Sequence, residues 1–228
     1  MTTSQRRISS ALVLVGSLVA VPSASASLIT IGIGAFQMGS TLTTFNGLAT
    51  GTEVNGLTVD AEVGPGGAIL FQYSLGNGRL AINVGPNTTA NINPPAIVSN
   101  PGPNDDGVLT MTFPSLVDVF GYGYALQATG TIFNATTVSL FNGATPVGSQ
   151  VFTAMPDLVF PGGFAGVQST LPFNRAEVTF NSTAAAAFAL DNIRRGPAVP
   201  AVPEPASAML LAMGLLAIIR ARTRSKTM

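Results

Sequence analysis

Apolar and polar residues alternate along much of the chain between residues 27 and 195, with the two-residue period of a β-strand. In Ala176–Phe180 the apolar side chains fall on one side, and Glu177 and Thr179 fall on the other. Asn-Gly and Asp-Gly dipeptides, which suit tight turns, separate these stretches, and none of the stretches has a convincing helical period. We therefore predict an all-β fold, an antiparallel β-sandwich, with strands at Leu28–Phe36, Glu53–Val63, Ala68–Leu75, Leu80–Val84, Val108–Phe113, Leu116–Leu126, Thr131–Phe141, Val147–Thr153, Arg175–Phe180 and Ala186–Ile193.

One of these strands alternates aromatic residues with glycine. Phe120, Tyr122 and Tyr124 share one face, while Gly121 and Gly123 lie on the other. The glycines indicate a face that is covered or closely approached by backbone. The tyrosines have two interpretations, as part of the core or as a platform on which a sugar ring stacks, and the alternation with glycine favours the core.

Two stretches are rich in proline. Prolines and turn residues interrupt Gly85 to Asn104, so we predict a long loop there rather than a strand. Loops of this kind on a rigid sandwich often bind ligands and are just as often inert surface. Residues 196–201 are spaced by prolines, which predicts an extended linker after a domain at residues 27–195.

Residues 1–26 have the three parts of a secretory signal peptide. Arg6 and Arg7 form the basic start, Ala11–Val21 is the apolar run, and Ala24 and Ala26 match the small-residue cleavage pattern. The two arginines lack the rest of a twin-arginine pattern, so we predict export by the Sec route. Cleavage after Ala26 leaves a mature chain that begins at the next residue.

The last segment, residues 202–226, also has three parts. These are a rigid motif, Val202, Pro203, Glu204 and Pro205; an apolar run, Ala206–Ile219; and a basic end, Arg220, Arg222, Arg224 and Lys226. A helix over the apolar run is about 21 Å long at ~1.5 Å per residue, shorter than the ~30 Å hydrocarbon core of a bilayer. We predict a short transmembrane helix whose arginines snorkel, with the basic end as its cytoplasmic anchor. A buried core helix is the alternative, which the lack of a polar face disfavours.

This order of motif, apolar run and basic end resembles the PEP-CTERM sorting signal of exported Gram-negative bacterial proteins, whose tripeptide is here Pro203-Glu204-Pro205. The resemblance implies a precursor anchored in the inner membrane, processing by an exosortase, and then a place in the cell envelope, on the surface or in the extracellular matrix. Residues 44–52, 107–113 and 187–193 are similar to the jelly-roll ectodomains that often precede such signals, and these are lectin-like or galactose-binding-like.

The same resemblance implies a structural or adhesive role in association with exopolysaccharide or biofilm matrix, so polysaccharide is a candidate partner. A calcium-dependent carbohydrate-binding module is the second hypothesis, and an envelope hydrolase is the third. A glycan-binding assay with and without calcium separates the first two.

Composition removes several kinds of chemistry. The chain has no Cys and no His, which excludes a disulfide framework, a Cys or His metal site, and histidine acid–base catalysis. Between residues 27 and 200, four basic residues stand against nine acidic ones, a net charge of −5. An acidic domain argues against nucleic acid as a partner.

The acidic residues are the remaining candidates for a site. Glu53, Asp105, Asp106 and Asp191 lie at predicted strand ends, where carboxylates and loop carbonyls suit a hard cation such as Ca²⁺. Alternatively, these acids form only the hydrogen bonds of turns and strand ends. The sequence has no EF-hand spacing, which favours this alternative over a calcium site. Nothing in the sequence pairs acids as a glycosidase requires. We therefore predict no enzymatic activity, no catalytic residues and no cofactor, with structural calcium as the alternative.

Overall fold

The computed structural model describes residues 26–36, 40–85, 92–99 and 106–197. Its regular structure is almost entirely β-strand, and every strand pair is antiparallel. The elements are β1 (Leu28–Thr30), the 3₁₀ turn η1 (Ile33–Ala35), β2 (Thr41–Thr43), β3 (Thr58–Val59), β4 (Ile69–Tyr73), β5 (Leu80–Asn83), β6 (Ala96–Ser99), β7 (Leu109–Leu126), β8 (Ile132–Asn142), β9 (Thr145–Ala154), β10 (Gly162–Phe180) and β11 (Phe188–Gly196). The predicted all-β antiparallel sandwich is confirmed.

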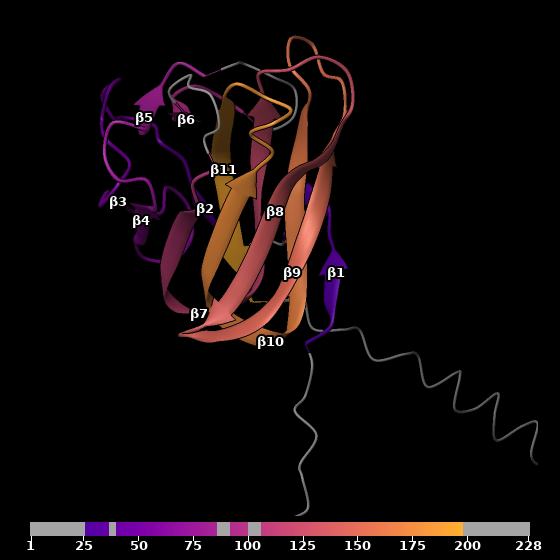
Figure 1. The fold of residues 1–228 in the computed structure, drawn as a ribbon. Coiled ribbons are helices and arrows are strands. Elements are labelled where there is room, and N and C mark those ends of the chain that lie inside the picture. Colours follow the sequence, from indigo (N-terminus) through magenta and orange to yellow (C-terminus); the bar gives the residue numbers. More distant parts are fainter. Residues whose placement is uncertain (1–25, 37–39, 86–91, 100–105, 198–228) are drawn as a thin grey trace, which may run out of the picture.

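A single hydrogen-bonded sheet folds over to make both layers of the sandwich (Figure 1). The β11 layer contains, in order, β5, β6, β11, the second half of β7, the first half of β10, and β1. The β8 layer contains, in order, β3, β4, the first half of β7, the second half of β10, β8 and β9. β7 and β10 therefore belong to both layers and join them.

β7 and β10 change layers through bends at the same end of the molecule. In β7 the bend comprises residues 114–116, which are exposed between buried neighbours. In β10 the register with β7 shifts between Gln168 and Phe173, and again between Phe173 and Arg175. Irregularities of this kind allow a strand to turn a corner and to continue in a second sheet.

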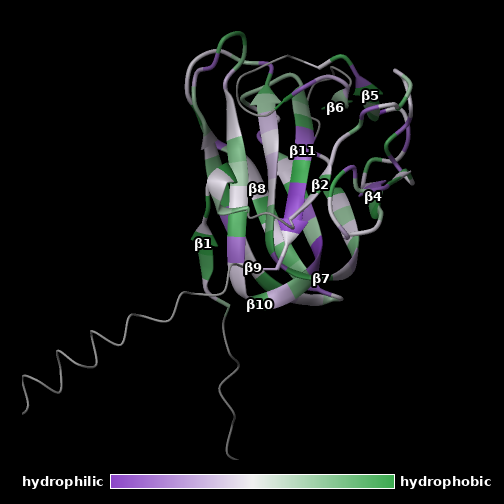
Figure 2. Ribbon diagram, turned by 180° about the vertical axis from the view of Figure 1, so that it is seen from behind, coloured by the Kyte–Doolittle hydropathy of each residue, from purple (hydrophilic) through white to green (hydrophobic). Residues whose placement is uncertain are grey.

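The space between the layers is filled by apolar and aromatic side chains, because the strands alternate hydrophobic and hydrophilic positions (Figure 2). Tyr122 and Tyr124 belong to this core, with 0% and 1% of their surface exposed, so neither forms a sugar platform. The hydroxyl oxygen of Tyr122 lies 2.7 Å from Oγ1 of Thr136. Tyr124 donates to the carbonyl of Thr153 at 2.9 Å, so both buried hydroxyls have partners.

The glycine face of β7 is covered, as the sequence predicts. A Cβ atom at Gly121 would lie 2.6 Å from Cζ of Phe164, so no larger residue fits without displacement. Phe36, just after η1, packs edge-on against Phe164, with ring centroids 5.6 Å apart. The segment that follows β1 thus covers the outer side of the β11 layer.

Several strand predictions need correction. The stretch predicted as a loop from Gly85 to Asn104 contains β6, which pairs with both β5 and β11. β10 begins at Gly162, far before the predicted start at Arg175, and β2 was not predicted. The two strands predicted on either side of residues 114 and 115 are one continuous strand, β7. β1 ends at Thr30, because the chain turns into η1 instead of continuing to Phe36 as a strand.

The two ends of the sandwich differ, and we name them the tail pole and the distal pole. At the tail pole lie Ser27, whose N–H bonds Oγ1 of Thr170 at 3.0 Å, the β8–β9 turn, and Gly196, the last residue of β11. The distal pole carries the loops at residues 127–131, 155–161 and 181–187 (Figure 1). Both ends of the domain therefore leave from one pole.

Among the described residues, no helix has the length and apolar character needed to span a membrane. Of the predicted signal peptide cleavage residues, Ala24 lies outside the described residues and Ala26 is the first of them. The predicted transmembrane run Ala206–Ile219 lies outside the described residues.

Candidate functional site

The sorting motif and its basic end lie outside the described residues, so the structure shows only where the domain before them ends. β11 ends at Gly196, beside Val119 of β7. Next to it, the buried guanidinium of Arg195 donates to the backbone carbonyls of Gly66, at 2.7 Å, and Gly67. Burial lowers the pKa of Arg195 to about 10. These contacts hold the last strand to the rest of the tail pole.

Asp191 is the most unusual of the predicted site residues. It lies on β11 opposite Gly123 and is only 1% exposed. Its Oδ2 accepts the N–H of Asn93 at 2.9 Å, while Oδ1 has no hydrogen-bond partner among the described residues. Burial raises the pKa of Asp191 to about 7; the charge of Glu62 also raises it, and the backbone N–H groups of Asn93 and Asn192 oppose the shift.

Glu62 is a neighbour of Asp191 that the sequence did not single out. Its Oε2 accepts from the Thr44 hydroxyl and from Nδ2 of Asn46, the latter at 3.2 Å. Its negative charge is the smallest of the causes that shift the pKa of Asp191. No spacing rule could have found this pair, because 129 positions separate them in the chain and only the fold joins β11 to the segment after β3.

The other predicted acids have separate partners. Asp106 accepts from the Ser182 hydroxyl, and Glu53 accepts the N–H of Gly78 at 2.8 Å. Asp105 lies outside the described residues. Within the described part of the chain, no group of three or more Asp, Glu, His or Cys residues is arranged to hold a metal ion.

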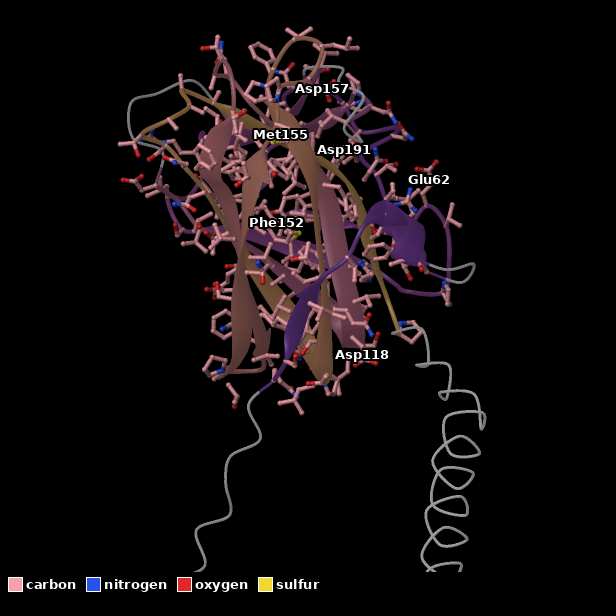
Figure 3. All side chains as sticks on the ribbon, turned by 90° about the vertical axis from the view of Figure 1, so that its right-hand side faces the viewer. Glu62, Asp118, Phe152, Met155, Asp157 and Asp191 are labelled. Atoms are coloured by element: carbon pink, nitrogen blue, oxygen red, sulfur yellow. The ribbon has the colours of Figure 1, made fainter. Side chains whose placement is uncertain are left out.

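The two acids within strands are also apart from this region. Glu177 pairs with Arg175 at 3.4 Å on β10. Asp118 lies toward the tail pole, whereas Asp191, Asp157 and Met155 lie toward the distal pole (Figure 3). Glu177 lies opposite Thr110 and Ser139 in the β8 layer, whereas Asp118 lies beyond the bend of β7, so the two acids do not share the setting that a paired-carboxylate hydrolase needs.

A hollow of about 330 Å³ opens at the distal pole, on the outer side of the β11 layer. Its lining comes from the ends of β5, β6 and β7, the loop before β10, and the start of β11: Val84, Gly85, Val98, Ala125, Gln127, Phe160, Ala187, Phe188 and Ala189. We call it the distal groove. It exists because its floor is built of small residues, with Ala125 directly opposite Ala189.

The lining of the distal groove has no charged residue, one amide, on Gln127, and one aromatic ring that packs on its floor, on Phe160. Phe188 also lines the groove, but its ring is stacked on Phe180 in the core. Phe160 is half-buried, so one part of its ring packs against Ala125 and Ala189 while another part remains accessible. A neutral amphipathic ligand suits such a lining better than an ion. The volume of the groove is at the lower end of the range for small-molecule sites.

Large apolar side chains are exposed around the distal pole. Leu158 is 77% exposed and Val84 is 74% exposed, and Val159, Met155 and Phe133 also face solvent. Exposed apolar residues gathered at one place often mark an interaction surface. Exposed apolar side chains also occur elsewhere in the fold, for example Ile29 and Leu116 at 52% and 54% exposed, so these residues alone do not define a patch.

Residues 201–225 match the PEP-CTERM protein-sorting motif. The predicted sorting signal is confirmed. A PEP-CTERM signal indicates an exported protein that is sorted to the surface. The roles given to individual residues of the motif, to the basic end and to the cleavage site at Ala24 and Ala26 remain predictions.

None of the curated proteins matches this chain. Among solved structures, a mutant of the family 29 carbohydrate-binding module CBM29-2 is 15% identical; the match covers 68% of this chain and 99% of the module, with a TM-score of 0.35. The catalytic domain of a GH87 alpha-1,3-glucanase in complex with nigerose is 13% identical; the match covers 75% of this chain and 31% of that protein, with a TM-score of 0.39. Likeness at this level assigns neither a ligand nor a site.

Proposed function

We propose that this chain is a structural or adhesive protein of the cell envelope, exported by the Sec route and associated with exopolysaccharide. Its precursor is anchored in the inner membrane by Ala206–Ile219 and is processed by an exosortase at Val202–Pro205. The observation that carries the proposal is the PEP-CTERM motif at residues 201–225, which follows closely after a complete β-sandwich.

The placement of the two poles supports a surface role. The tail continues from Gly196 at the tail pole, while the distal groove and the exposed apolar side chains lie at the opposite pole. An anchor at the tail pole therefore presents the distal pole away from the membrane. The proposed role is non-enzymatic, and the dispersed carboxylates of the described residues support this.

Processing is tested in a host that carries the sorting machinery. Mass spectrometry of the mature protein should find a C-terminus at or near Pro205, and Glu204→Ala should reduce that product. The proposal fails if the protein in the mature envelope fraction is intact to Met228. An inactive processing enzyme serves as the control, because it should leave both forms uncleaved.

A calcium-dependent carbohydrate-binding module is the second candidate, favoured by the neutral, partly aromatic distal groove. We expect sugar rings to stack on the accessible part of Phe160 and to hydrogen-bond the amide of Gln127. Asp191, with one buried oxygen unpartnered and Glu62 close by, fits a hard cation better than Asp106 does. The ion would then stabilise the domain near the groove.

A glycan-binding assay tests this second candidate. All residues of both hydrophobic clusters lie between Leu28 and Ile193, so residues 27–197 contain a complete core and can be studied without the tails. Phe160→Ala should weaken binding of a retained glycan by roughly two- to tenfold, because loss of a stacking contact costs about 0.5–1.5 kcal/mol. Val159→Ala is the matched control, since it removes an exposed neighbour that does not line the groove. Equal binding by both variants argues against the groove.

A further inference from the structure

The floor of the distal groove is one level of the β11 layer at which the side chains are small and aliphatic. Ala125 of β7 lies opposite Ala189 of β11, and Val98 of β6 lies opposite Ala189 on its other side. Gly85 packs closely on the same floor, because a Cβ atom there would lie 3.2 Å from Cγ2 of Val98 and 3.5 Å from Cβ of Ala189. The floor is therefore a row of methyl-sized groups with open space above it.

This floor has no polar side chain, and its backbone groups are already paired. At this level β6, β7 and β11 each have a hydrogen-bonded neighbour on both sides. At the rim, the N–H of Gln127 donates to the carbonyl of Ala187 at 2.7 Å. A sugar hydroxyl placed on the floor would lose its water without gaining a partner, which costs free energy. The part of a ligand that touches the floor must therefore be apolar.

One side chain of the lining can form hydrogen bonds, and it stands beside the floor. Gln127 is exposed and comes two positions after Ala125, so the alternation of an extended chain places both on the outer side of the layer. Its amide has donors on Nε2 and an acceptor at Oε1. The groove thus combines a methyl-sized apolar floor with a single neutral hydrogen-bonding group.

We propose that the distal groove recognises the acetyl groups of an acetylated polysaccharide. The acetyl methyl group lies on the floor at Ala125 and Ala189, and the adjacent carbonyl oxygen accepts a hydrogen bond from Nε2 of Gln127. The sugar that carries the acetyl group stacks on the accessible part of Phe160. An acetyl group places a methyl group next to a neutral acceptor, which matches this lining. The inference rests on the carbohydrate-binding candidate proposed above.

Charge favours a neutral acetylated polymer over an acidic one. No basic residue lines the groove, and Asp157 lies three positions before Phe160 in the same loop. Residues 27–200 carry a net charge of −5. A polymer rich in uronic acids would therefore be repelled by the domain and would find no cation in the groove.

Matched oligosaccharides test the acetyl group itself. Tetra-N-acetylchitotetraose and cellotetraose share one backbone and differ in carrying acetamido or hydroxyl groups. An O-acetylated glucomannan fragment is compared with the same fragment after alkaline deacetylation. In calorimetry, residues 27–197 should bind the acetylated member of at least one pair roughly tenfold more tightly, because one methyl group is buried and one hydrogen bond forms. The pair that responds distinguishes N-acetyl from O-acetyl groups.

Two variants locate the contact. Gln127→Leu keeps a side chain of similar size without the amide, so the preference for the acetylated member should fall about fivefold. Gln72→Leu makes the same change at an exposed position of β4 and is the control. Ala189→Val fills the floor with a residue that suits a strand, and it should also reduce the preference. Thermal melting checks the fold of each variant, and Gln127→Leu decides if Ala189→Val does not fold.

Nuclear magnetic resonance gives a readout that does not depend on affinity. In protein labelled at its alanine methyl groups, the acetylated ligand should shift the signals of Ala125 and Ala189. The signal of Ala176, which is buried between the two layers, should not move. Saturation of the protein should be transferred most strongly to the acetyl methyl protons of the ligand.

Equal binding of both members of each pair would overturn the acetyl inference, and it would leave the carbohydrate-binding candidate in place if Phe160→Ala weakened both. An unchanged preference in folded Gln127→Leu would also overturn the inference, as would no binding of any acetylated probe. Tighter binding of 1-hexanol than of the acetylated fragments would indicate a groove for acyl chains and overturn it too. Processing at the C-terminus is measured separately, so these outcomes leave the test of the proposed envelope role unaffected.

Discussion

Replacing Asp191 by Asn should stabilise the protein at neutral pH and remove a pH dependence that the wild-type chain shows. The carboxyl group of Asp191 is almost fully buried, and burial raises its pKa from 3.8 to about 7. Each unit of pKa difference between the folded and unfolded states corresponds to ~1.36 kcal/mol. A shift of roughly three units therefore sets an upper value of about 4 kcal/mol for the cost of ionising Asp191 in the folded protein.

The sign follows from which state holds the proton. Between about pH 4 and pH 7 the folded protein keeps Asp191 protonated while the unfolded chain has already lost that proton. Stability from this group is therefore greatest below pH 4, falls as the pH rises, and reaches its lower limit above pH 7. Carboxylates whose pKa is lowered by folding make the protein more stable as the pH rises. The contribution of Asp191 must therefore be isolated by comparing the wild type with a variant that lacks this carboxyl group.

Asn has nearly the shape of Asp, and its oxygen can still accept the N–H of Asn93. Urea denaturation at pH 4.5 and pH 7.5, in buffer that contains EDTA, should show a gain for Asp191→Asn that is large at pH 7.5 and small at pH 4.5. Asp60→Asn makes the same chemical change at an exposed position and controls for net charge. Parallel pH profiles of the wild type and Asp191→Asn would refute the argument from burial.

Three further predictions concern other parts of the chain. Millimolar calcium should raise the melting temperature of residues 27–197 if an ion binds at Asp191, and Asp191→Asn should abolish the rise; no shift in the wild type ends the calcium hypothesis. Tyr122→Phe should cost about 1 kcal/mol in chemical denaturation, because the hydroxyl contact with Thr136 is lost, and an unchanged midpoint would contradict it. Neutral replacements at all four basic residues of the tail, Arg220, Arg222, Arg224 and Lys226, should release unprocessed precursor from the membrane. The reason is that each cation resists translocation by ~2.3 kcal/mol per 100 mV. If fractionation finds this variant fully retained in the membrane, a feature other than the basic end anchors the precursor.

Alternation identified the strands that have one buried and one exposed face, and it failed where both faces are covered. The first half of β10 is rich in glycine and has no clear alternation. A Cβ atom at Gly166 would lie 2.3 Å from the carbonyl oxygen of Ile31, so this glycine permits a close approach by the segment after β1. No local pattern in the sequence reveals this role, because the chain that covers Gly166 is 135 positions away.

β6 was missed for a related reason. The prolines at 94 and 95 indicate a loop, and they do precede the strand directly, but they do not prevent Ala96–Ser99 from pairing between β5 and β11. The candidate site could be predicted from the sequence only in part, for the same reason. Residue type and strand position point to Asp191, whereas its contact with the N–H of Asn93 depends on how β11 packs against a segment 98 positions away.

The position of β11 explains how a domain anchored by its C-terminus can resist tension. β11 lies within its layer, paired with β7 on one side and with β2 and β6 on the other. Near its end, Ile193–Arg195 pairs with Thr41–Thr43 while Arg194 and Arg195 also face β7. A pull along the tail is therefore shared by hydrogen bonds on both sides of the strand, whereas an edge strand would carry the same load on one side only. Arg195, which binds the carbonyls of Gly66 and Gly67, adds side-chain contacts at the point where that load enters the fold.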